Sequence, residues 1–386
     1  MAARTAQARC SSAELRIQLY TDDPAIVAVG ERQLGRQLLD VVLAWWLSLG
    51  FRLAWRKGTY QFTETPLHHQ PQLVHDWVGI RYCTRGSVSV MSLTPEFLNS
   101  TRLALRPFLR RHGQAKIASV RSAVGKCSRI SQVVPTAKPF SSSMWAALTG
   151  ALQAQEAGRE EAALGYVPVS RFFVAAAWFD ALIEGDLPYG RWPLEREVSR
   201  QPVHLARAPA DAHVEFDASP WGGGGLLRLQ GHIVQHFTVR WDDEVLGILG
   251  ARAGDSRWQT VYEYVTLLVA LLLWGDSGAE KLLYVYGDNV GALQCAQDLK
   301  GRGPMLLISR ELAWRRVRHR WEFELAHLPA ELNGDADALS RVHAEPPTPL
   351  PPSVQKRGVI ERQVPPWSCV FTAWLRSLRR RHGMKA

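Results

Sequence analysis

Hydrophobic and polar positions divide the first part of the chain into segments of different periodicity. Residues 14–20 alternate as a half-buried strand does, and residues 25–29 are predicted to return as a second strand. Apolar residues in segment 31–49 recur at helical spacing, which predicts a helix that ends at Gly50. Short strands are then predicted at 51–55, 77–83 and 87–93. The segment 1–95 is therefore interpreted as a mixed α/β unit.

The middle of the chain is predicted to be a basic helical module. Segment 97–155 contains no Asp or Glu, and its apolar residues are spaced as in short helices. We assign this module to residues 96–160, with a solvated helical face that only aids solubility as the alternative interpretation. Residues 161–210 are aromatic, Pro-containing and weakly patterned, which indicates a connecting segment. Eight basic residues are candidates for binding a nucleic-acid backbone: Arg102, Arg106, Arg110, Arg111, Lys116, Arg121, Lys126 and Arg129.

Residues 211–343 are predicted to form a mixed sheet flanked by helices. Three strands come first as an antiparallel meander, and helices then alternate with parallel strands. The predicted strands are 213–217, 226–230, 232–239, 282–286 and 323–327, and the predicted helices include 259–274 and 335–341. Four consecutive glycines follow the first strand. The Pro-rich and basic segment 344–386 is expected to be a mobile tail.

Composition narrows the class of protein. The 386 residues are 46% hydrophobic, enough for a sizeable core, and the net charge of +10 favours a polyanionic partner, above all nucleic acid. The longest apolar runs are too short to span a membrane, and the N-terminus lacks the apolar stretch of a signal peptide. Five scattered cysteines support neither a disulfide framework nor a zinc site. We therefore expect a cytosolic or nuclear protein.

Four carboxylates occupy positions from which they could converge. Asp217 lies in the first strand of the predicted sheet, Glu263 near a helix start, Asp288 after a buried strand and Asp337 near the start of the last helix. Four acids brought together repel one another unless cations neutralise them, so the cluster predicts a divalent metal site. Oxygen-only ligands select Mg²⁺ or Mn²⁺, and two such ions suit in-line displacement at a phosphodiester.

Each acid also has an ordinary structural interpretation. Asp217 could be a turn residue, Glu263 a first-turn acid favoured by the helix dipole, and Asp288 the former of an Asx-turn. The order and spacing of all four together favour the metal site. Asp335 competes with Asp337 for the last place, but it is better placed as the N-cap of the final helix.

The segments that carry these acids resemble the type 1 ribonuclease H domain of retroelement polyproteins. The resemblance rests on Phe-Asp-Ala-Ser at 216–219, Tyr-Gly-Asp-Asn at 286–289, and the run from His327 to Arg341 that ends in Ala-Asp-Ala-Leu-Ser-Arg. Ala330 stands where the family often has Gly. The resemblance implies a ribonuclease H-like five-stranded sheet and cleavage of RNA in RNA/DNA hybrids. It also implies that Asp217, Glu263, Asp288 and Asp337 bind metal, that His327 assists catalysis, and that Asn289 and Asn333 contact nucleic acid.

The N-terminal segment resembles another part of the same polyproteins. Tyr20, Asp22 and Asp23 are similar to the Tyr-x-Asp-Asp hairpin of reverse transcriptases, and Lys57 matches a lysine that follows the palm helix. The segment 77–80 resembles the primer-grip strand, and the basic module takes the place of the thumb. The Leu-Ser-Arg ending and Pro24 are similar to elements of the gypsy and DIRS types. The third polymerase carboxylate and the fingers lie upstream in that family, and residues 1–19 contain no Asp.

Three hypotheses follow for the whole chain. The first is a C-terminal reverse transcriptase fragment that binds template-primer duplexes and retains ribonuclease H activity, with RNA-directed DNA polymerase activity doubtful. The second is a catalytically silent nucleic-acid-binding remnant. The third is a truncated gene model of a full reverse transcriptase. The sequence does not indicate the oligomeric state of the protein.

Overall fold

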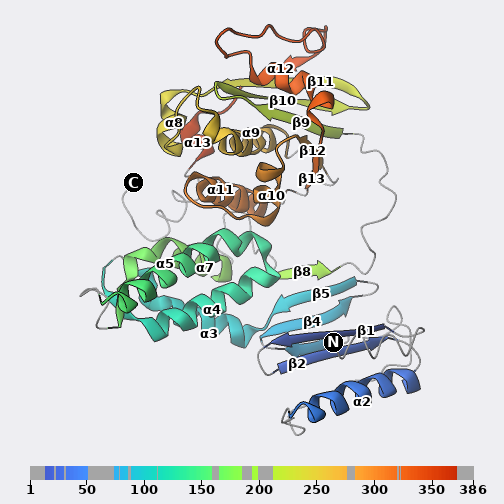
Figure 1. Cartoon of the computed structure of the whole chain (residues 1–386), viewed down its shortest axis with the longest axis vertical. Helices are drawn as coiled ribbons and strands as arrows, with labels where there is room; N and C mark the ends of the chain where they lie inside the picture. Colours follow the sequence, from blue (N-terminus) through green and yellow to red (C-terminus); the bar gives the residue numbers. More distant parts are fainter. Residues whose placement is uncertain are drawn as a thin grey trace. The chain divides into compact units, whose positions relative to one another are not determined.

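The structure is a computed structural model of the whole chain (Figure 1). Compactness divides it into two units, of which the first comprises residues 1–97 and 195–200 and the second residues 98–194 and 201–386. The predicted division into five parts stays a prediction. The structure describes residues 14–20, 23–29, 32–50, 74–77, 79–85, 88–110, 112–158, 165–184, 194–198, 212–275, 283–319, 321 and 323–371.

The first unit opens with a β-hairpin and a helix. Strands β1 (Glu14–Tyr20) and β2 (Asp23–Val29) pair antiparallel, with Tyr20 opposite Asp23. Helix α2 (Arg32–Ser48) contacts β2, and Gly50 beyond its end adopts the left-handed φ of +83° that favours glycine. The hairpin and the helix were both predicted, although β2 begins two residues earlier than expected.

A four-stranded antiparallel sheet completes the first unit. Its order is β3 (Val74–Trp77), β4 (Ile80–Arg85), β5 (Val88–Leu93) and β8 (Glu195–Val198). The predicted strand 77–83 is instead split by a turn at Gly79, where φ is +81° and a Cβ would lie 2.6 Å from the Phe97 ring. The predicted strand 51–55 lies outside the described residues.

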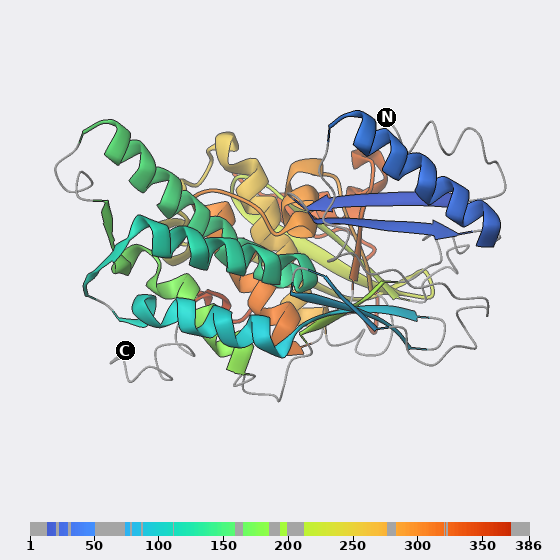
Figure 2. The same ribbon diagram turned by 90° about the horizontal axis from the view of Figure 1, so that it is seen from below.

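The N-terminal half of the second unit is helical. Its helices are longer than the short ones predicted, because each has a buried stripe that is continuous over several turns. Helix α4 lies beside α5 (Figure 2), and α5 also contacts α7 through the stacked rings of Phe140 and Trp178, 4.2 Å apart. The elements are α3 (Pro95–Leu105), η3 (Arg106–Leu109), β6 (Gln114–Lys116), α4 (Ile117–Val133), η4 (Pro135–Ala137), α5 (Lys138–Glu156), β7 (Tyr166–Pro168), η5 (Val169–Arg171) and α7 (Phe173–Glu184).

A mixed sheet forms the rest of the second unit, with strand order β13-β12-β9-β10-β11-β14 (Figure 1). Strands β9, β10 and β11 are antiparallel, whereas β12 and β13 run parallel to β9. This is the mixed, ribonuclease H-like sheet predicted from the sequence, extended by the two-residue β14. The strands are β9 (Ala212–Ala218), β10 (Gly222–Leu229), β11 (His232–Arg240), β12 (Leu283–Gly287), β13 (Phe323–His327) and β14 (Ile360–Glu361).

Helices cover both faces of this sheet. The helices of this region are α8 (Asp243–Leu249), α9 (Gln259–Trp274), α10 (Val290–Asp298), α11 (Pro304–His319), α12 (Gly334–Ser340) and α13 (Trp367–Val370), with short η6 (Ser256–Trp258) and η8 (Ala330–Leu332) turns. Helix α9 is apolar nearly all round and packs on β9 and β10, which is why its predicted bounds agree with the structure.

Strand β10 begins with the four glycines, which had not been assigned to a strand. A Cβ at Gly223 would lie 2.3 Å from Thr266 of α9, and one at Gly224 would lie 2.4 Å from Leu339 of α12. Successive strand residues point to opposite faces, so these contacts place α9 and α12 on opposite faces of the sheet. The glycines let both helices approach the backbone closely.

Residues 344–371 are packed, which corrects the expectation of a mobile tail for this part. Val354 is buried against Leu226 and Leu339, and β14 pairs with β11. The indole Nε1 of Trp367 donates a hydrogen bond to Asp242 Oδ2 at 3.1 Å. Apolar residues in a Pro-rich segment thus cover the sheet without forming long elements. Residues 372–386 lie outside the described part.

Within the described part of the chain, no helix combines the length and the hydropathy that a membrane crossing needs.

Candidate metal centre

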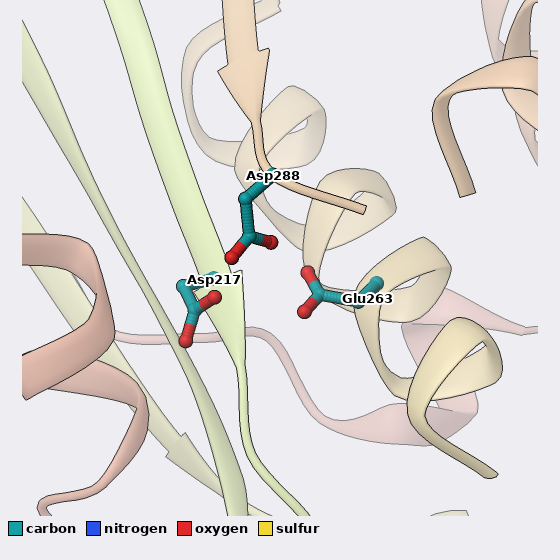
Figure 3. Close-up of side chains that lie close together, drawn as sticks. All are labelled: Asp217, Glu263 and Asp288. Atoms are coloured by element: carbon teal, nitrogen blue, oxygen red, sulfur yellow. The ribbon is translucent and has the colours of Figure 1, made fainter. Parts of the chain in front are cut away.

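Three of the predicted acids meet at one end of the mixed sheet (Figure 3). Asp217 is the penultimate residue of β9, and Asp288 directly follows β12. These strands are parallel neighbours, so their carboxyl ends lie at the same edge. Glu263 is on the second turn of α9, which packs on β9. Ligand oxygens of the three carboxylates all lie within 4.8 Å of one another.

The cluster is largely removed from water. Asp217 is 4% exposed and Glu263 1% exposed, whereas Asp288 is half-buried. Burial raises the pKa of Asp217 to about 7, and the nearby charges of Asp288 and Asp337 add to the rise. A hydrogen bond from Ser340 and the charge of Arg341 oppose it. Without a bound cation, Asp217 therefore keeps its proton to a higher pH than an ordinary aspartate does.

The pKa values of the other two carboxyl groups are also raised. Burial raises the pKa of Glu263 well above its usual range, and repulsion from Asp217 and Asp288 adds to this. Burial is also the main reason that the pKa of Asp288 is raised, followed by the charge of Asp337, with His327 acting in the opposite direction. The cluster thus carries more negative charge than its own surroundings neutralise.

The donor set fits a hard divalent cation. Gln259 Nε2 donates to Glu263 Oε1 at 2.9 Å, but the buried Glu263 Oε2 has no hydrogen-bond partner among the described residues. A buried carboxylate oxygen without a donor is costly unless a cation occupies that position. All donors are carboxylate oxygens, which favours Mg²⁺ or Mn²⁺ over zinc.

Several residues that orient the acids were not singled out as site residues from the sequence. Ser340 Oγ donates to Asp217 Oδ2 at 2.7 Å, and Ser219 Oγ donates to the Ser340 carbonyl oxygen, also at 2.7 Å. Gln259 reaches both Glu263 and the carbonyl oxygen of Ala218. The signal for Gln259 is its position four residues before Glu263 on one helix face. Ser340 could only be found from the approach of α12 to β9.

Asp337 does not join the three-carboxylate group in this structure. It lies on α12, and its Oδ1 accepts a hydrogen bond from Arg341 Nε at 2.8 Å and forms an ion pair with Nη2 at 2.7 Å. Its charge still raises the pKa values of Asp217 and Asp288, so it borders the cluster. The predicted fourth ligand is therefore adjacent to the site but paired with an arginine.

His327 ends β13, beside the strand that leads to Asp288. Gly287 is its register partner, and the His327 side chain is exposed. Its charge lowers the pKa of Asp288, which indicates that the imidazole lies near that carboxylate. An exposed histidine at the edge of an acid cluster can exchange protons with solvent and with a bound substrate.

The two predicted asparagine contacts have structural partners. Asn333 is 1% exposed, and its Nδ2 donates to the Phe216 carbonyl oxygen at 3.0 Å. Its burial corrects the expectation of a nucleic-acid contact, because the amide instead fixes the strand residue before Asp217. Asn289 is the N-cap of α10, and its Oδ1 accepts a hydrogen bond from the Ala292 amide.

Asp335 is not the N-cap that the sequence predicted. The N-cap position of α12 is Asn333, and Asp335 lies within the first turn. Its carboxylate accepts hydrogen bonds from Arg228 Nη2 at 2.9 Å and Ser353 Oγ at 2.6 Å. The partner of Asp335 is therefore an arginine on a distant strand, which the local sequence pattern could not predict.

The predicted basic residues of the helical module differ in exposure and in their partners. Arg106, Arg110, Lys116 and Arg121 are exposed. Arg102 forms ion pairs with Asp180 and Glu184 of α7, and Lys126 Nζ donates to Ser100 Oγ at 2.7 Å. Arg129 is half-buried, and Arg111 lies outside the described residues. Arg106, Arg110, Lys116 and Arg121 therefore present their positive charges to solvent.

The polymerase-like residues are described only in part. Tyr20 and Asp23 pair across the end of the β1–β2 hairpin, as a Tyr-x-Asp-Asp turn requires. Asp22 and Lys57 lie outside the described residues. In the segment of the primer-grip resemblance, Trp77 ends β3, Ile80 begins β4 and Gly79 lies between them with a positive φ.

Comparisons with known proteins gave structural likeness alone. No protein-family profile matches the sequence, and no curated protein matches it. Among solved structures, ribonuclease H1 from the halophilic archaeon Halobacterium salinarum NRC-1 has 22% identity, with 35% of this chain and 98% of that one covered at a TM-score of 0.26.

Two foamy viral structures are also similar over a longer range. The protease-reverse transcriptase in complex with dsDNA has 12% identity over 81% of this chain and 55% of that chain, at a TM-score of 0.28. The same viral protein in complex with an RNA/DNA hybrid has 13% identity over 81% of this chain and 36% of that chain, at a TM-score of 0.27. The chain thus spans about a third to a half of these viral proteins. The strand order and the acid geometry define the fold and the site independently of these likenesses.

Proposed function

We propose that this protein hydrolyses the RNA strand of RNA/DNA hybrids in a reaction that depends on Mg²⁺ or Mn²⁺. The observation that carries the proposal is the convergence of Asp217, Glu263 and Asp288 within 4.8 Å, with the buried Glu263 Oε2 lacking a hydrogen-bond partner in the described part of the chain. Burial and mutual repulsion raise all three pKa values, so the cluster is poised to take up cations rather than to form internal ion pairs.

The residues have distinct parts in this reaction. Asp217, Glu263 and Asp288 hold the cations, and Asp337 is the fourth ligand if Arg341 releases it. When bound, a pair of such ions activates water and stabilises charge on the phosphate oxygens. Gln259 and Ser340 orient the ligands, and His327 accepts or returns a proton at the exposed edge of the site. The products would carry 5′-phosphate and 3′-hydroxyl ends.

Substrate choice is expected to come from duplex shape and the 2′-hydroxyl rather than from base sequence. The exposed Arg106, Arg110, Lys116 and Arg121 are suited to contact phosphates of the same duplex. Binding should then weaken steeply as salt rises. DNA polymerase activity is not part of the proposal, because Asp22 lies outside the described residues.

A second candidate is a catalytically silent nucleic-acid-binding protein. The ion pair between Asp337 and Arg341 favours it, since that pair keeps one of the four expected ligands out of the acid cluster. The two candidates predict the same salt-dependent binding and differ only in turnover.

The test is a cleavage assay on an end-labelled RNA/DNA hybrid with Mg²⁺, with primer extension measured on the same preparation. We expect cleavage of the RNA strand, and primer extension decides separately whether the protein synthesises DNA. Asp288→Asn should abolish cleavage and leave hybrid binding within about twofold. Asp243→Asn is the matched control, because Asp243 is an exposed first-turn acid of α8. Binding without cleavage by the unaltered protein, in Mg²⁺ and in Mn²⁺, would refute the nuclease and support the silent binder.

A further inference from the structure

A polar network joins the sheet to α12 on the same face as Asp217. Arg228 of β10 donates from Nε to Glu215 Oε1 at 2.8 Å and from Nη2 to Glu215 Oε2 at 3.2 Å. The same Nη2 donates to Asp335 Oδ2 of α12 at 2.9 Å. One guanidinium therefore bridges a strand carboxylate and a helix carboxylate.

The network is neutralised by its own side chains. Glu215 is 7% exposed; burial alone would raise its pKa, but hydrogen bonds from His213 and Arg228 outweigh burial and the pKa is lowered. His213 Nε2 lies 3.1 Å from Glu215 Oε1. A planar guanidinium suits this bridging better than an ammonium, because its donors lie in a fixed fork. The geometry is thus specified at both of its carboxylate contacts.

The network also engages the segment that follows α12. Ser353 Oγ donates to Asp335 Oδ1 at 2.6 Å, so both oxygens of this carboxylate are held. Asp335 is consequently fixed from two sides, by β10 and by the chain that packs over the sheet. It is therefore not available as a metal ligand in this arrangement.

The orientation of α12 links Asp335 to Asp337. Residues two apart in a helix differ by about 200° around its axis, so holding Asp335 on one side directs Asp337 to the other. Glu215 and Asp217 lie on the same face of β9, because strand residues two apart share a face. Arg228 thus joins the strand of one metal-binding carboxylate to the helix of another.

Helix α12 has seven residues, of which Ala336, Leu339 and Ser340 are buried, and it packs on β9 and β10. Its C-terminal end is held by Ser340, which reaches Asp217, and the residue before it, Asn333, is bound to Phe216. On its first turn, Asp335 is tied by Arg228 and by Ser353. Loss of the Arg228 contact would let the first turn shift between the anchors at Asn333 and Ser340.

We propose that Arg228 and Asp335 form a positioning clamp that sets the rotation of α12 and so places Asp337 beside the acid cluster. The inference rests on the proposed function, since it assigns Arg228 and Asp335 to the assembly of that metal site. Neither residue belongs to the group of three carboxylates. Their effect should therefore appear in metal affinity before it appears in nucleic-acid binding.

The experiment compares Asp335→Asn with Asp243→Asn, an equal loss of charge on another short helix. The readout is the Mg²⁺ concentration that gives half of the maximal thermal stabilisation, measured without substrate, together with hybrid cleavage and hybrid binding in EDTA. We expect Asp335→Asn to raise the half-saturating Mg²⁺ by about tenfold. Hybrid binding in EDTA should be unchanged, and Asp243→Asn should match the unaltered protein in every measurement.

A second variant guards against a folding defect. Arg228→Lys keeps the positive charge beside the buried Glu215 but cannot span both carboxylates, so it should fold and still shift the Mg²⁺ requirement. If both variants need the same Mg²⁺ as Asp243→Asn, the clamp is refuted and the network is merely structural. If Mg²⁺ stabilises the protein but no hybrid is cut, the nuclease proposal fails while the clamp is still decided by the titration. If Mg²⁺ does not stabilise the unaltered protein, both proposals are refuted.

Discussion

Glu215 and Asp217 are two residues apart on one strand, share one face of it and are both buried. Even so, the pKa values of their carboxyl groups are shifted in opposite directions. Arg228 and His213 lower the pKa of Glu215, whereas burial and neighbouring acids raise that of Asp217 to about 7. The Glu215 carboxylate is paired with side chains of the protein itself, Arg228 and His213. Asp217 accepts a hydrogen bond from Ser340 and senses the charge of Arg341, but burial and the neighbouring acids outweigh both. Burial is thus common to both, and the charge of the neighbours distinguishes a structural carboxylate from one suited to bind metal.

The largest expected effect is on catalysis at the unneutralised member of the pair. Asp217→Asn removes a metal-binding oxygen and should lower hybrid cleavage by more than about 100-fold, beyond the loss typical of residues that only support a ligand. It should also stabilise the metal-free protein at pH 8, because a buried charge is removed. Single-turnover cleavage and thermal unfolding in EDTA measure the two effects. Retained cleavage would remove Asp217 from the site.

Glu215, whose charge is neutralised within the protein, should instead affect stability when its partner is removed. Arg228→Met leaves Glu215 buried without its main counter-charge and should lower the free energy of unfolding by about 3–5 kcal/mol. Adding Glu215→Leu should recover most of this loss, because apolar replacement of a whole buried ion pair is often neutral. Denaturant unfolding of the two single variants and the double variant tests this coupling. Equal stability of Arg228→Met and the double variant would contradict it.

The pH dependence of stability follows from the raised pKa values. Between pH 4 and pH 7 the folded state holds a proton on Asp217 that the unfolded state has released, so stability falls as pH rises through this window. The fall should be on the order of 2–4 kcal/mol without metal, with a further contribution from Glu263. Saturating Mg²⁺ should remove most of it. Unfolding free energies at pH 5 and pH 8, with Mg²⁺ and with EDTA, make the measurement; a slope unchanged by Mg²⁺ would contradict cation binding at Asp217.

The smallest expected effect concerns the donor to Asp217. Ser340→Ala removes a hydrogen bond of 2.7 Å and should cost about 1 kcal/mol of stability at pH 8. The pKa of Asp217 should rise further, because the hydroxyl favours the charged form. NMR titration of the Asp217 carboxyl in the variant checks the direction. A lowered pKa would show that Ser340 does not donate to this carboxylate.

The sequence predicted the elements that local pattern controls. Helix 259–274 and strand 323–327 agree with α9 and β13, because a helix buried nearly all round and a short parallel strand are each marked by their apolar residues. The mixed sheet followed from the order of these elements. The split at Gly79 and the inclusion of the glycines in β10 were missed, since they depend on what approaches each glycine.

The candidate site was predicted to a similar extent. Asp217, Glu263 and Asp288 come together because strand and helix order brings them to one sheet edge. The roles of Asn333 and Asp335 differ from those predicted, because their partners are Phe216 and Arg228, more than a hundred residues away in the chain. No local pattern specifies such a partner.

By itself the sequence determined which carboxylates exist, which elements carry them, and that an acid cluster would need cations. Only the tertiary structure decided which buried acids are already neutralised by arginine and histidine and which are not. The physical reason is that a carboxylate's protonation and metal affinity depend on charges a few ångströms away, and packing, not chain order, sets that distance.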